Sequence, residues 1–89
     1  MILVAFDLET TPDFDRAYRK ATKKNLELKK AIDNKVRQIL EGPNRFKPMH
    51  KPLHLLRRVH ILKSFVLLYL IKEGSVVLVK FEHHDDAYR

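Results

Sequence analysis

Hydrophobic positions recur with two different periods along the chain, and the first half is dominated by the helical one. Before the helical pattern begins, the chain has an apolar run rich in β-forming residues, Ile2 to Leu8. This run is followed by ETTP and predicts a buried or half-buried strand. Apolar residues then recur at helical spacing from Pro12 to about Lys24, behind Thr11 as a capping residue. A strand and a helix are therefore expected first.

A second helix is predicted after Asn25, which can cap it. Its apolar positions form one stripe, and its charged positions face away from that stripe. The stripe consists of Leu28, Ile32, Val36, Ile39 and Leu40. The helix should stop at the breaker pair Gly42-Pro43, so the two helices are expected to form a hairpin. Residues 43–54 contain three prolines and are expected to form an irregular basic loop.

The second half has the short runs of β-forming residues that indicate strands. We expect three of them, at about Leu55 to Leu62, Phe65 to Lys72 and Val76 to Glu82. The intervening turns, Lys63-Ser64 and Glu73-Gly74-Ser75, are short enough for antiparallel hairpins. The order β-α-α-β-β-β predicts an α+β fold in which a helical hairpin packs on a small, mainly antiparallel sheet. The 89 residues are expected to form a single domain, residues 1–89.

Positive charge is concentrated in one part of the chain. The net charge is +7, and residues 42–72 hold seven Lys or Arg and no Asp or Glu. A segregated basic surface attracts polyanions, of which phosphate backbones are the commonest in cells. We therefore expect contact with nucleic acid or the ribosome, and the simpler alternative is a solvated basic face.

Composition also excludes several classes of protein. The chain has no Cys, so a disulfide framework and a thiolate site are both excluded. The longest uncharged apolar run, Ser64 to Ile71, is far shorter than the roughly 20 residues that a spanning helix needs. The opening run lacks the basic segment of a secretory signal. A cytoplasmic protein without membrane association is expected.

Candidate chemistry begins with alternation in the strand that contains LLRRVHI. If Val59 and Ile61 face the helices, Arg58 and His60 stand together on the opposite face. This arrangement places a permanent cation beside an imidazole. Such groups suit metal-independent RNA cleavage, which needs a general base, a general acid and cations that stabilise a charged transition state.

The carboxyl-terminal stretch HHDDAYR could complete such a site by folding back over the sheet. It would bring His83 or His84, the phenol of Tyr88 and the guanidinium of Arg89 close to Arg58. An ordinary polar tail and a solvated surface remain alternatives. A transition-metal site is a further alternative, although adjacent residues such as His83 and His84 diverge on an extended chain and would rarely share one ion.

A different nuclease class is suggested by the stretch AFDLETT. Alternation places Asp7 and Glu9 on one face of the first predicted strand, as in the paired carboxylates of DEDD exonucleases, which bind Mg²⁺. That class needs a longer chain and two further carboxylate motifs. Asp85 and Asp86 are the remaining candidate pair, so this alternative is the weaker one.

The segments RFKPMHKPLHLLRRVHILKSFVLLYLI and VVLVKFEHHDDAYR resemble the RelE/ParE toxin superfamily, especially RelE-like and YafQ-like toxins. The resemblance implies a RelE-like fold and an mRNA interferase, an endoribonuclease that cleaves mRNA on the ribosome by 2′-hydroxyl attack without a metal or other cofactor. It also implies neutralisation by a cognate RelB-like antitoxin, with which a heterotetramer could form. The ParE branch implies an alternative, a non-enzymatic toxin that poisons DNA gyrase.

The resemblance also implies the roles of particular residues. His60 and His84 match the working imidazoles of the YafQ-like branch, and Tyr88 matches a terminal aromatic that orients the substrate. The expected catalytic residues are His60, His84, Arg58, Tyr88, His83 and Lys47, with Lys51 as the alternative match to Lys47. The expected RNA-binding residues are Arg45, Lys51, Arg57, Lys63 and Arg89. Two positions depart from the family. This chain has Val66 where the RelE branch has an Arg, and it has Ser64 where the YafQ-like branch has an acid.

Overall fold

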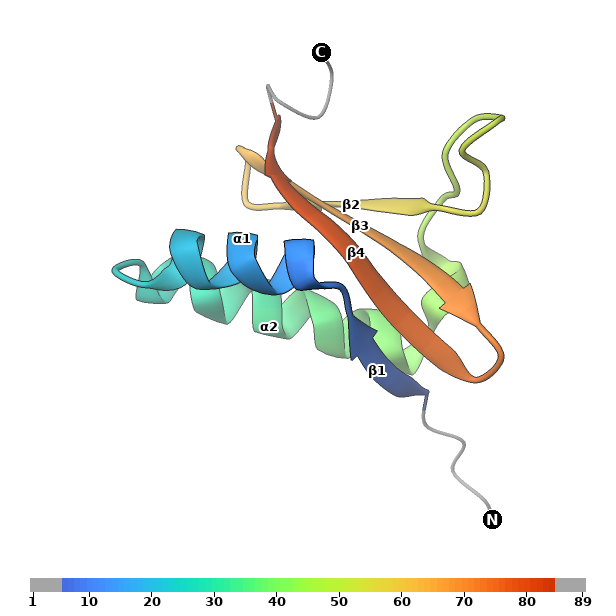
Figure 1. The fold of residues 1–89 in the computed structure, drawn as a ribbon, viewed down its shortest axis with the longest axis horizontal. Helices are drawn as coiled ribbons and strands as arrows, with labels where there is room; N and C mark the ends of the chain where they lie inside the picture. The colour runs from blue at the N-terminus through green and yellow to red at the C-terminus, as the bar shows by residue number, and fades with distance from the viewer. Residues whose placement is uncertain (1–5, 85–89) are drawn as a thin grey trace.

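Two helices cover one face of a four-stranded sheet in the computed structural model, which describes residues 6–84 (Figure 1). The elements are β1 (Asp7–Thr10), α1 (Pro12–Thr22), α2 (Leu26–Glu41), the 3₁₀ turn η1 (Pro43–Arg45), β2 (Arg57–Ile61), β3 (Phe65–Lys72) and β4 (Ser75–His83). The strand order is β1-β4-β3-β2; β1 is parallel to β4, and the other pairs are antiparallel. The predicted α+β fold and element order are confirmed.

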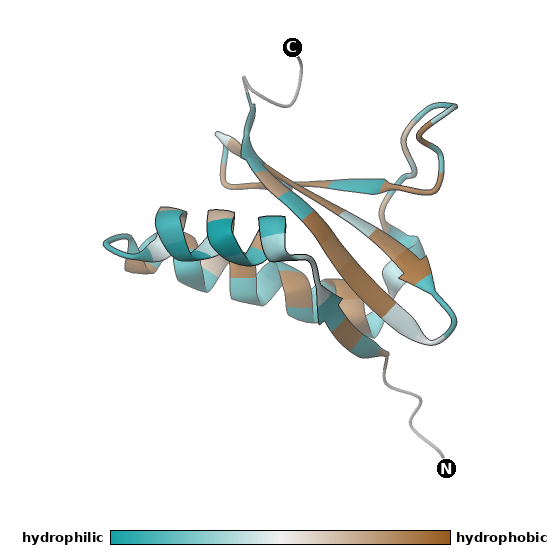
Figure 2. Cartoon of the chain, in the orientation of Figure 1, coloured by the Kyte–Doolittle hydropathy of each residue, from teal (hydrophilic) through white to brown (hydrophobic). Residues whose placement is uncertain are grey.

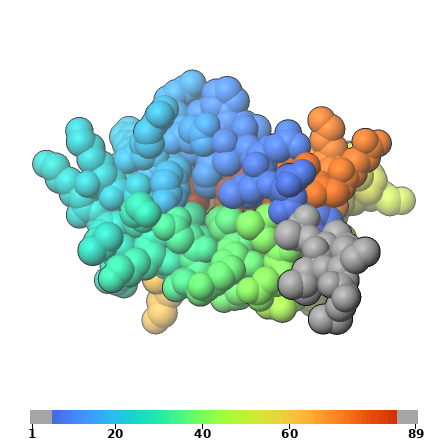
Figure 3. Space-filling model, turned by 90° about the horizontal axis from the view of Figure 1, so that it is seen from below, coloured from blue at the N-terminus to red at the C-terminus, as the bar shows by residue number. Residues whose placement is uncertain are grey.

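Both helices begin at the capping residues that the sequence predicts. The side chain of Thr11 accepts a hydrogen bond from the backbone N–H of Phe14 at 3.0 Å. The side chain of Asn25 accepts one from Leu28 at the same distance. These caps satisfy donors that the first turn of a helix leaves unpaired. The helices then lie side by side and cover the face of the molecule shown in Figure 3.

The first strand differs from its prediction in position and in burial. β1 begins at Asp7, and all four of its residues are exposed, including Leu8 at 46%. Residues 1–5, which were expected to form most of this strand, lie outside the described residues. The prediction of a buried or half-buried strand is wrong for Asp7 and Leu8, which are exposed on an edge strand that pairs with β4 on one side.

The boundaries of the later strands also shift. β2 begins at Arg57 rather than Leu55, and Leu62 belongs to the β2–β3 turn with a φ of 53°. The turn after β3 consists of Glu73 and Gly74, whose φ angles of 33° and 82° suit a two-residue hairpin. β4 consequently starts at Ser75, one residue earlier than expected.

The core lies between the helices and the sheet. Figure 2 shows hydrophobic residues along β3 and β4 and at intervals on α2. Tyr69 is fully buried there, and its hydroxyl donates a hydrogen bond to the carbonyl of Pro43 at 2.6 Å. The buried core comprises Phe14, Leu28, Ile32, Ile39, Val59, Ile61, Leu67, Tyr69, Val76, Leu78 and Phe81. The apolar stripe predicted for the second helix therefore supplies most of the helical side of the core, and Phe14 of α1 completes it.

Residues 43–56, the basic loop, return along the open edge of β2. The backbone N–H of Met49 donates a hydrogen bond to the carbonyl of Leu56 at 2.8 Å. The backbone N–H of Arg58 donates one to the carbonyl of Lys47 at 3.5 Å. Pro48 forms an isolated bridge with Arg57. The predicted irregular loop is thus ordered against the sheet, and Figure 1 shows it extending beyond β2.

Candidate functional site

The face of the sheet that points away from the helices carries the candidate site. Val59 and Ile61 in β2 are buried, whereas His60 between them is exposed. Strand register places Arg58 beside Leu68 of β3, and His60 beside Val66. Directly paired residues share a face of an antiparallel sheet. The expectation that Arg58 and His60 share this outer face is confirmed.

The outer face brings two histidines together from different parts of the chain. The imidazole rings of His60 and His84 have centroids 5.5 Å apart and planes inclined by 31°. The backbone N–H of His84 donates to the carbonyl of Ser64, which extends the hydrogen-bonding ladder one residue beyond β4. Ser64 therefore positions His84 through its main chain, and the side-chain departure from the family does not affect this contact.

The adjacent His83 lies on the other face. Its ring packs in a T-shaped arrangement against that of Phe65, with centroids 5.4 Å apart, and Phe65 in turn stacks on Phe81 of the core. His83 also lines a hollow together with Ala17 and Ala21 of α1. The structure therefore brings His84 to His60 but not His83.

A pocket of about 460 Å³ lies beside this histidine pair. Its described lining residues carry four basic groups and no carboxylate: Lys47, Pro48, Met49, His50, Arg58 and His60. The basic loop supplies the first four of these residues, and β2 supplies the other two. A positively charged pocket of this kind suits a phosphate group of a polyanion.

Three residues near the site were not among the sequence candidates. His50 lines the pocket next to Arg58 and His60. Lys80 and Glu82 lie on the outer face because they pair with Leu68 and Val66, and they form an ion pair with a 3.4 Å Nζ–Oε1 distance. The alternation of Lys80, Glu82 and His84 was the sequence signal for these two residues. His50 was obscured by the near-repeat of KPMH and KPLH.

The remaining candidates are dispersed. Arg57 is held by the basic loop, because its Nη1 donates to the carbonyl of Phe46 and its Nη2 to Oδ1 of Asn44. Arg45, Lys51 and Lys63 have exposed side chains in η1, the basic loop and the β2–β3 turn. Tyr88 and Arg89 lie outside the described residues, as do Asp85 and Asp86. The roles assigned to all these residues remain predictions.

Val66 separates His60 from Glu82 on the outer face. It is 1% exposed and pairs with both residues through the strand register. An apolar side chain cannot stabilise phosphate charge there. Among residues 6–84, Arg58 on the same strand and Lys47 of the basic loop line the pocket together with His60. The Arg that the resemblance implies at this position is therefore replaced by a buried side chain without charge.

The carboxylates of the exonuclease alternative lie at the opposite edge of the sheet. Asp7 and Glu9 are exposed on β1, whereas His60 is on β2, at the other end of the strand order. Within residues 6–84, no group of three His, Cys, Asp or Glu side chains is arranged to hold a metal ion. Also within these residues, no helix has the length and apolar character to cross a membrane.

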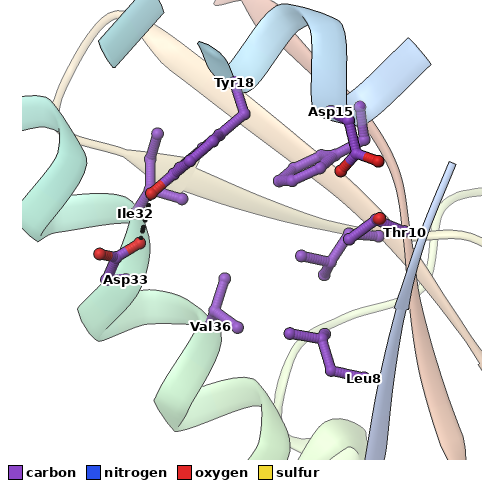
Figure 4. Close-up of a pocket in the computed structure, with 9 residues that line it drawn as sticks. Leu8, Thr10, Asp15, Tyr18, Ile32, Asp33 and Val36 are labelled. Atoms are coloured by element: carbon purple, nitrogen blue, oxygen red, sulfur yellow. Dashed lines mark hydrogen bonds between the residues drawn. The ribbon is translucent and has the colours of Figure 1, made fainter. Parts of the chain in front are cut away.

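A second pocket, of about 370 Å³, lies on the helical side between α1, α2 and β1 (Figure 4). Its lining is mainly apolar, and its described lining residues include Asp15 and Asp33 but no cation. The hydroxyl of Tyr18 donates to Asp33 at 2.9 Å, and partial burial together with this carboxylate raises the pKa of Tyr18. This pocket therefore lacks the positive charge that lines the pocket of the outer face.

Comparisons with known proteins agree with the resemblance seen in the sequence. The model of a family described as "ParE toxin of type II toxin-antitoxin system, parDE" matches residues 6–88. A protein of Methanocaldococcus jannaschii named "Putative toxin RelE4" is 36% identical over 86 residues, which cover 94% of this chain and 92% of that protein.

Solved structures show the same fold. The YoeB/ParE toxin from Agrobacterium tumefaciens superposes with a TM-score of 0.79 at 12% identity, covering 88% of this chain and 98% of that one. The Escherichia coli DinJ-YafQ toxin-antitoxin complex contains a chain that superposes with a TM-score of 0.74 at 11% identity, covering 94% and 98%. At these identities the likeness concerns the arrangement of helices and strands.

Proposed function

Because the chain belongs to the ParE toxin family of type II toxin-antitoxin systems, within the RelE/ParE superfamily, we propose that it acts as an endoribonuclease that cleaves mRNA on the ribosome. The observation that carries this proposal is the pairing of His60 with His84, whose ring centroids are 5.5 Å apart. Arg58 is on the same face, and the basic pocket adjoins it. A gyrase poison needs no such pair.

The proposed reaction needs two proton transfers, which the two imidazoles can divide between them. One imidazole takes the proton of the RNA 2′-hydroxyl as its oxygen forms a bond to phosphorus. The other donates a proton to the 5′-oxygen as the bond between that oxygen and phosphorus breaks. Imidazole suits both roles because it titrates near neutral pH when unperturbed. No metal is required for either step.

Positive charge at the pocket would stabilise the transition state. The attacked phosphate gains negative charge as the 2′-oxygen adds, and fixed cations are effective where that charge develops. Arg58 and Lys47 line the pocket beside His60, which makes them the proposed stabilising groups. Arg45, Lys51 and Lys63 are exposed in η1, the basic loop and the β2–β3 turn, and we propose that they hold the RNA backbone.

The proposed partners follow from family and charge. A type II toxin is paired with an antitoxin, and one structural relative, YafQ, was solved in complex with DinJ. We propose that a RelB-like antitoxin covers the basic outer face, with a heterotetramer as one arrangement. Attraction between opposite charges would speed this association. Action on translating mRNA also implies a cytoplasmic site of action.

The decisive experiment has two arms with the purified chain: cleavage of a defined mRNA during translation, and cleavage of the same RNA, free of ribosomes, in the presence of EDTA. Cleavage that persists in EDTA and disappears with His84→Ala would support the proposal. Cleavage of free RNA that requires added Mg²⁺ or Mn²⁺ would contradict the acid-base mechanism. Absence of cleavage both on the ribosome and on free RNA would contradict the endoribonuclease assignment.

The second candidate function is a gyrase poison without hydrolytic activity. The description of the matching family, which names the ParE toxin, favours it. The two functions predict different first events in an expressing cell. A fall in labelled amino acid incorporation before thymidine incorporation supports the endoribonuclease, and the opposite order supports the gyrase poison.

A further inference from the structure

An open edge of β4 lies between the outer face of the sheet and α1. β1 pairs with residues 75–78 of β4 and ends at Thr10, because the next residue, Thr11, caps α1. β4 continues to His83, and within residues 6–84 no other strand pairs with its last part on this side. α1 packs against β4 instead. A single strand therefore separates α1 from the face that carries the histidine pair.

Two adjoining hollows, of about 300 and 520 Å³, lie between this edge and α1. Four residues line both of them: Ala17, Lys20, Phe81 and Glu82. Because the hollows share these residues, they form one trough along the edge of β4. We call this trough, defined by the four shared residues, the edge groove.

The floor of the edge groove is apolar and partly aromatic. Ala17 and Ala21 of α1 are half-buried and leave room above them. Phe65 stacks on Phe81, with ring centroids 5.3 Å apart, and the ring of His83 packs against Phe65. Aromatic and apolar surfaces of this kind accept the face of an unpaired nucleobase.

The charged side chains of the groove leave an excess of positive charge. Asp13 is paired with Arg16 at 3.3 Å, and Glu82 is paired with Lys80 at 3.4 Å. Among the described residues, Lys20 has no carboxylate partner within ion-pair distance. Lys20 is also exposed, so its ammonium group is accessible to a phosphate at the rim of the groove.

Exposed cations continue from the groove along α1. Arg16, Arg19, Lys20 and Lys23 follow one another at spacings of three, one and three residues, which places them on one side of the helix. All four side chains are exposed. A row of cations on one helical face attracts a phosphate backbone and holds it without reading its sequence.

Main-chain groups of β4 also face the groove. The backbone N–H of His84 donates to the carbonyl of Ser64, on the β3 side. The direction of these bonds alternates along an antiparallel strand, so the N–H and C=O of Phe81 are turned away from β3. Phe81 lines both hollows, and the polar groups of an open strand edge are available to a ligand.

We propose that the edge groove binds a nucleotide of single-stranded RNA that flanks the nucleotide held at His60 and His84. One RNA strand would then cross the edge of β4, from the outer face of the sheet to α1. This inference rests on the proposed endoribonuclease function and adds a second RNA subsite to it. His83 and His84 are adjacent but lie on opposite faces of β4, so they would contact successive parts of the same strand.

Binding of an RNA that cannot be cleaved tests the groove independently of catalysis. The probe is a 2′-O-methyl oligouridylate of about 12 nucleotides, which lacks the attacking hydroxyl and is long enough to occupy both subsites. Fluorescence anisotropy measures its affinity for the full chain at about 0.15 M salt, where charges more than about 8 Å apart are largely screened. Lys20→Glu is expected to weaken binding by at least about tenfold, because it replaces a phosphate contact with repulsion.

Lys30→Glu is the matched control. It makes the same change of charge at an exposed position of α2 that does not line the groove, and it should weaken binding by less than about threefold. Circular dichroism verifies that both variants keep the fold. Equal weakening by the two variants would overturn the groove, because net charge alone would then account for it. Full affinity in Lys20→Glu, or no binding of the probe by the wild type, would overturn it as well.

The same proteins separate the groove from the proposed function. If the wild type does not cleave RNA and Lys20→Glu still weakens probe binding selectively, the endoribonuclease assignment fails and the groove stands. If the wild type cleaves RNA and the probe binds both variants equally, the groove fails and the endoribonuclease assignment stands.

Discussion

The guanidinium of Arg57 donates a hydrogen bond through Nη1 to the backbone carbonyl of Phe46, across eleven positions of the chain. Its Nη2 also donates to Oδ1 of Asn44 at 3.3 Å. These bonds connect the start of β2 to the beginning of the basic loop. Because β2 also carries Arg58 and His60, the same residue helps to hold the two walls of the basic pocket together.

Replacing Arg57 with Gln is expected to loosen the loop. The change removes charged donors from a partly buried carbonyl, which should lower the free energy of unfolding by about 1–2 kcal/mol. Urea denaturation measures this loss, and hydrogen exchange should increase in residues 46–56. Lys51→Gln, an exposed substitution in the same loop, is the control and should change stability by less than about 0.5 kcal/mol. Equal exchange in wild type and Arg57→Gln would show that the loop does not depend on this contact.

Removal of either paired imidazole is expected to reduce mRNA cleavage. His60→Ala and His84→Ala should each lower the rate on the order of 10²-fold or more if they transfer protons. The double variant should lose much less than the product of the two single losses, because both residues serve one reaction. His54→Ala, an exposed substitution in the basic loop, is the control. Cleavage at wild-type rate by both single variants would refute their catalytic assignment.

Tyr69→Phe isolates the hydrogen bond between the core and the start of η1. The substitution keeps the buried ring and leaves the carbonyl of Pro43 without its partner, so a loss of about 1–3 kcal/mol in the free energy of unfolding is expected. The matched control is Tyr18→Phe, whose lost hydrogen bond to Asp33 is exposed to solvent. That control should cost less than about 0.5 kcal/mol in urea denaturation. Equal losses in the two variants would contradict the importance of burial at Tyr69.

Tyr69 also predicts how stability depends on alkaline pH. Burial raises the pKa of its phenol above the ordinary value of 10.0, whereas the unfolded chain titrates near that value. Above about pH 10 the unfolded state therefore binds fewer protons than the folded state, and stability falls as the pH rises through the folded pKa. Stability measured at pH 9 to 11 should decline less steeply in Tyr69→Phe. An identical decline in both proteins would assign the alkaline loss to other groups.

Thr11→Ala tests a side chain that connects α1 to β4. The Thr11 hydroxyl caps the helix by accepting from Phe14 and donates to the carbonyl of Val79 at 2.7 Å. Val79 lies at the bulge in the β3–β4 pairing, where its carbonyl needs a donor. The loss of both bonds should cost about 1–2 kcal/mol, and Thr11→Ser should restore most of it. Thermal denaturation compares the three proteins, and failure of Ser to restore stability would assign the loss to the Thr methyl group.

Local sequence signals determined most of the fold of this protein. Thr11 and Asn25 cap the helices because short polar side chains satisfy the first backbone donors, and this requires only neighbouring residues. Gly42 ends α2, and alternation places His60 on the face opposite Val59. The same reasoning missed the exposure of β1, because the burial of a strand depends on how many neighbours it has in the sheet.

The sequence by itself determined the elements, the basic character of residues 42–72 and the outer position of Arg58 and His60. Only the tertiary structure decided that His84 and not His83 joins His60, because the bulge at Val79 shifts the alternation of faces in β4 by one residue. It also decided that His50 lines the pocket and that Arg57 is bonded to the basic loop. These contacts depend on the path of the loop along β2, which local periodicity does not encode.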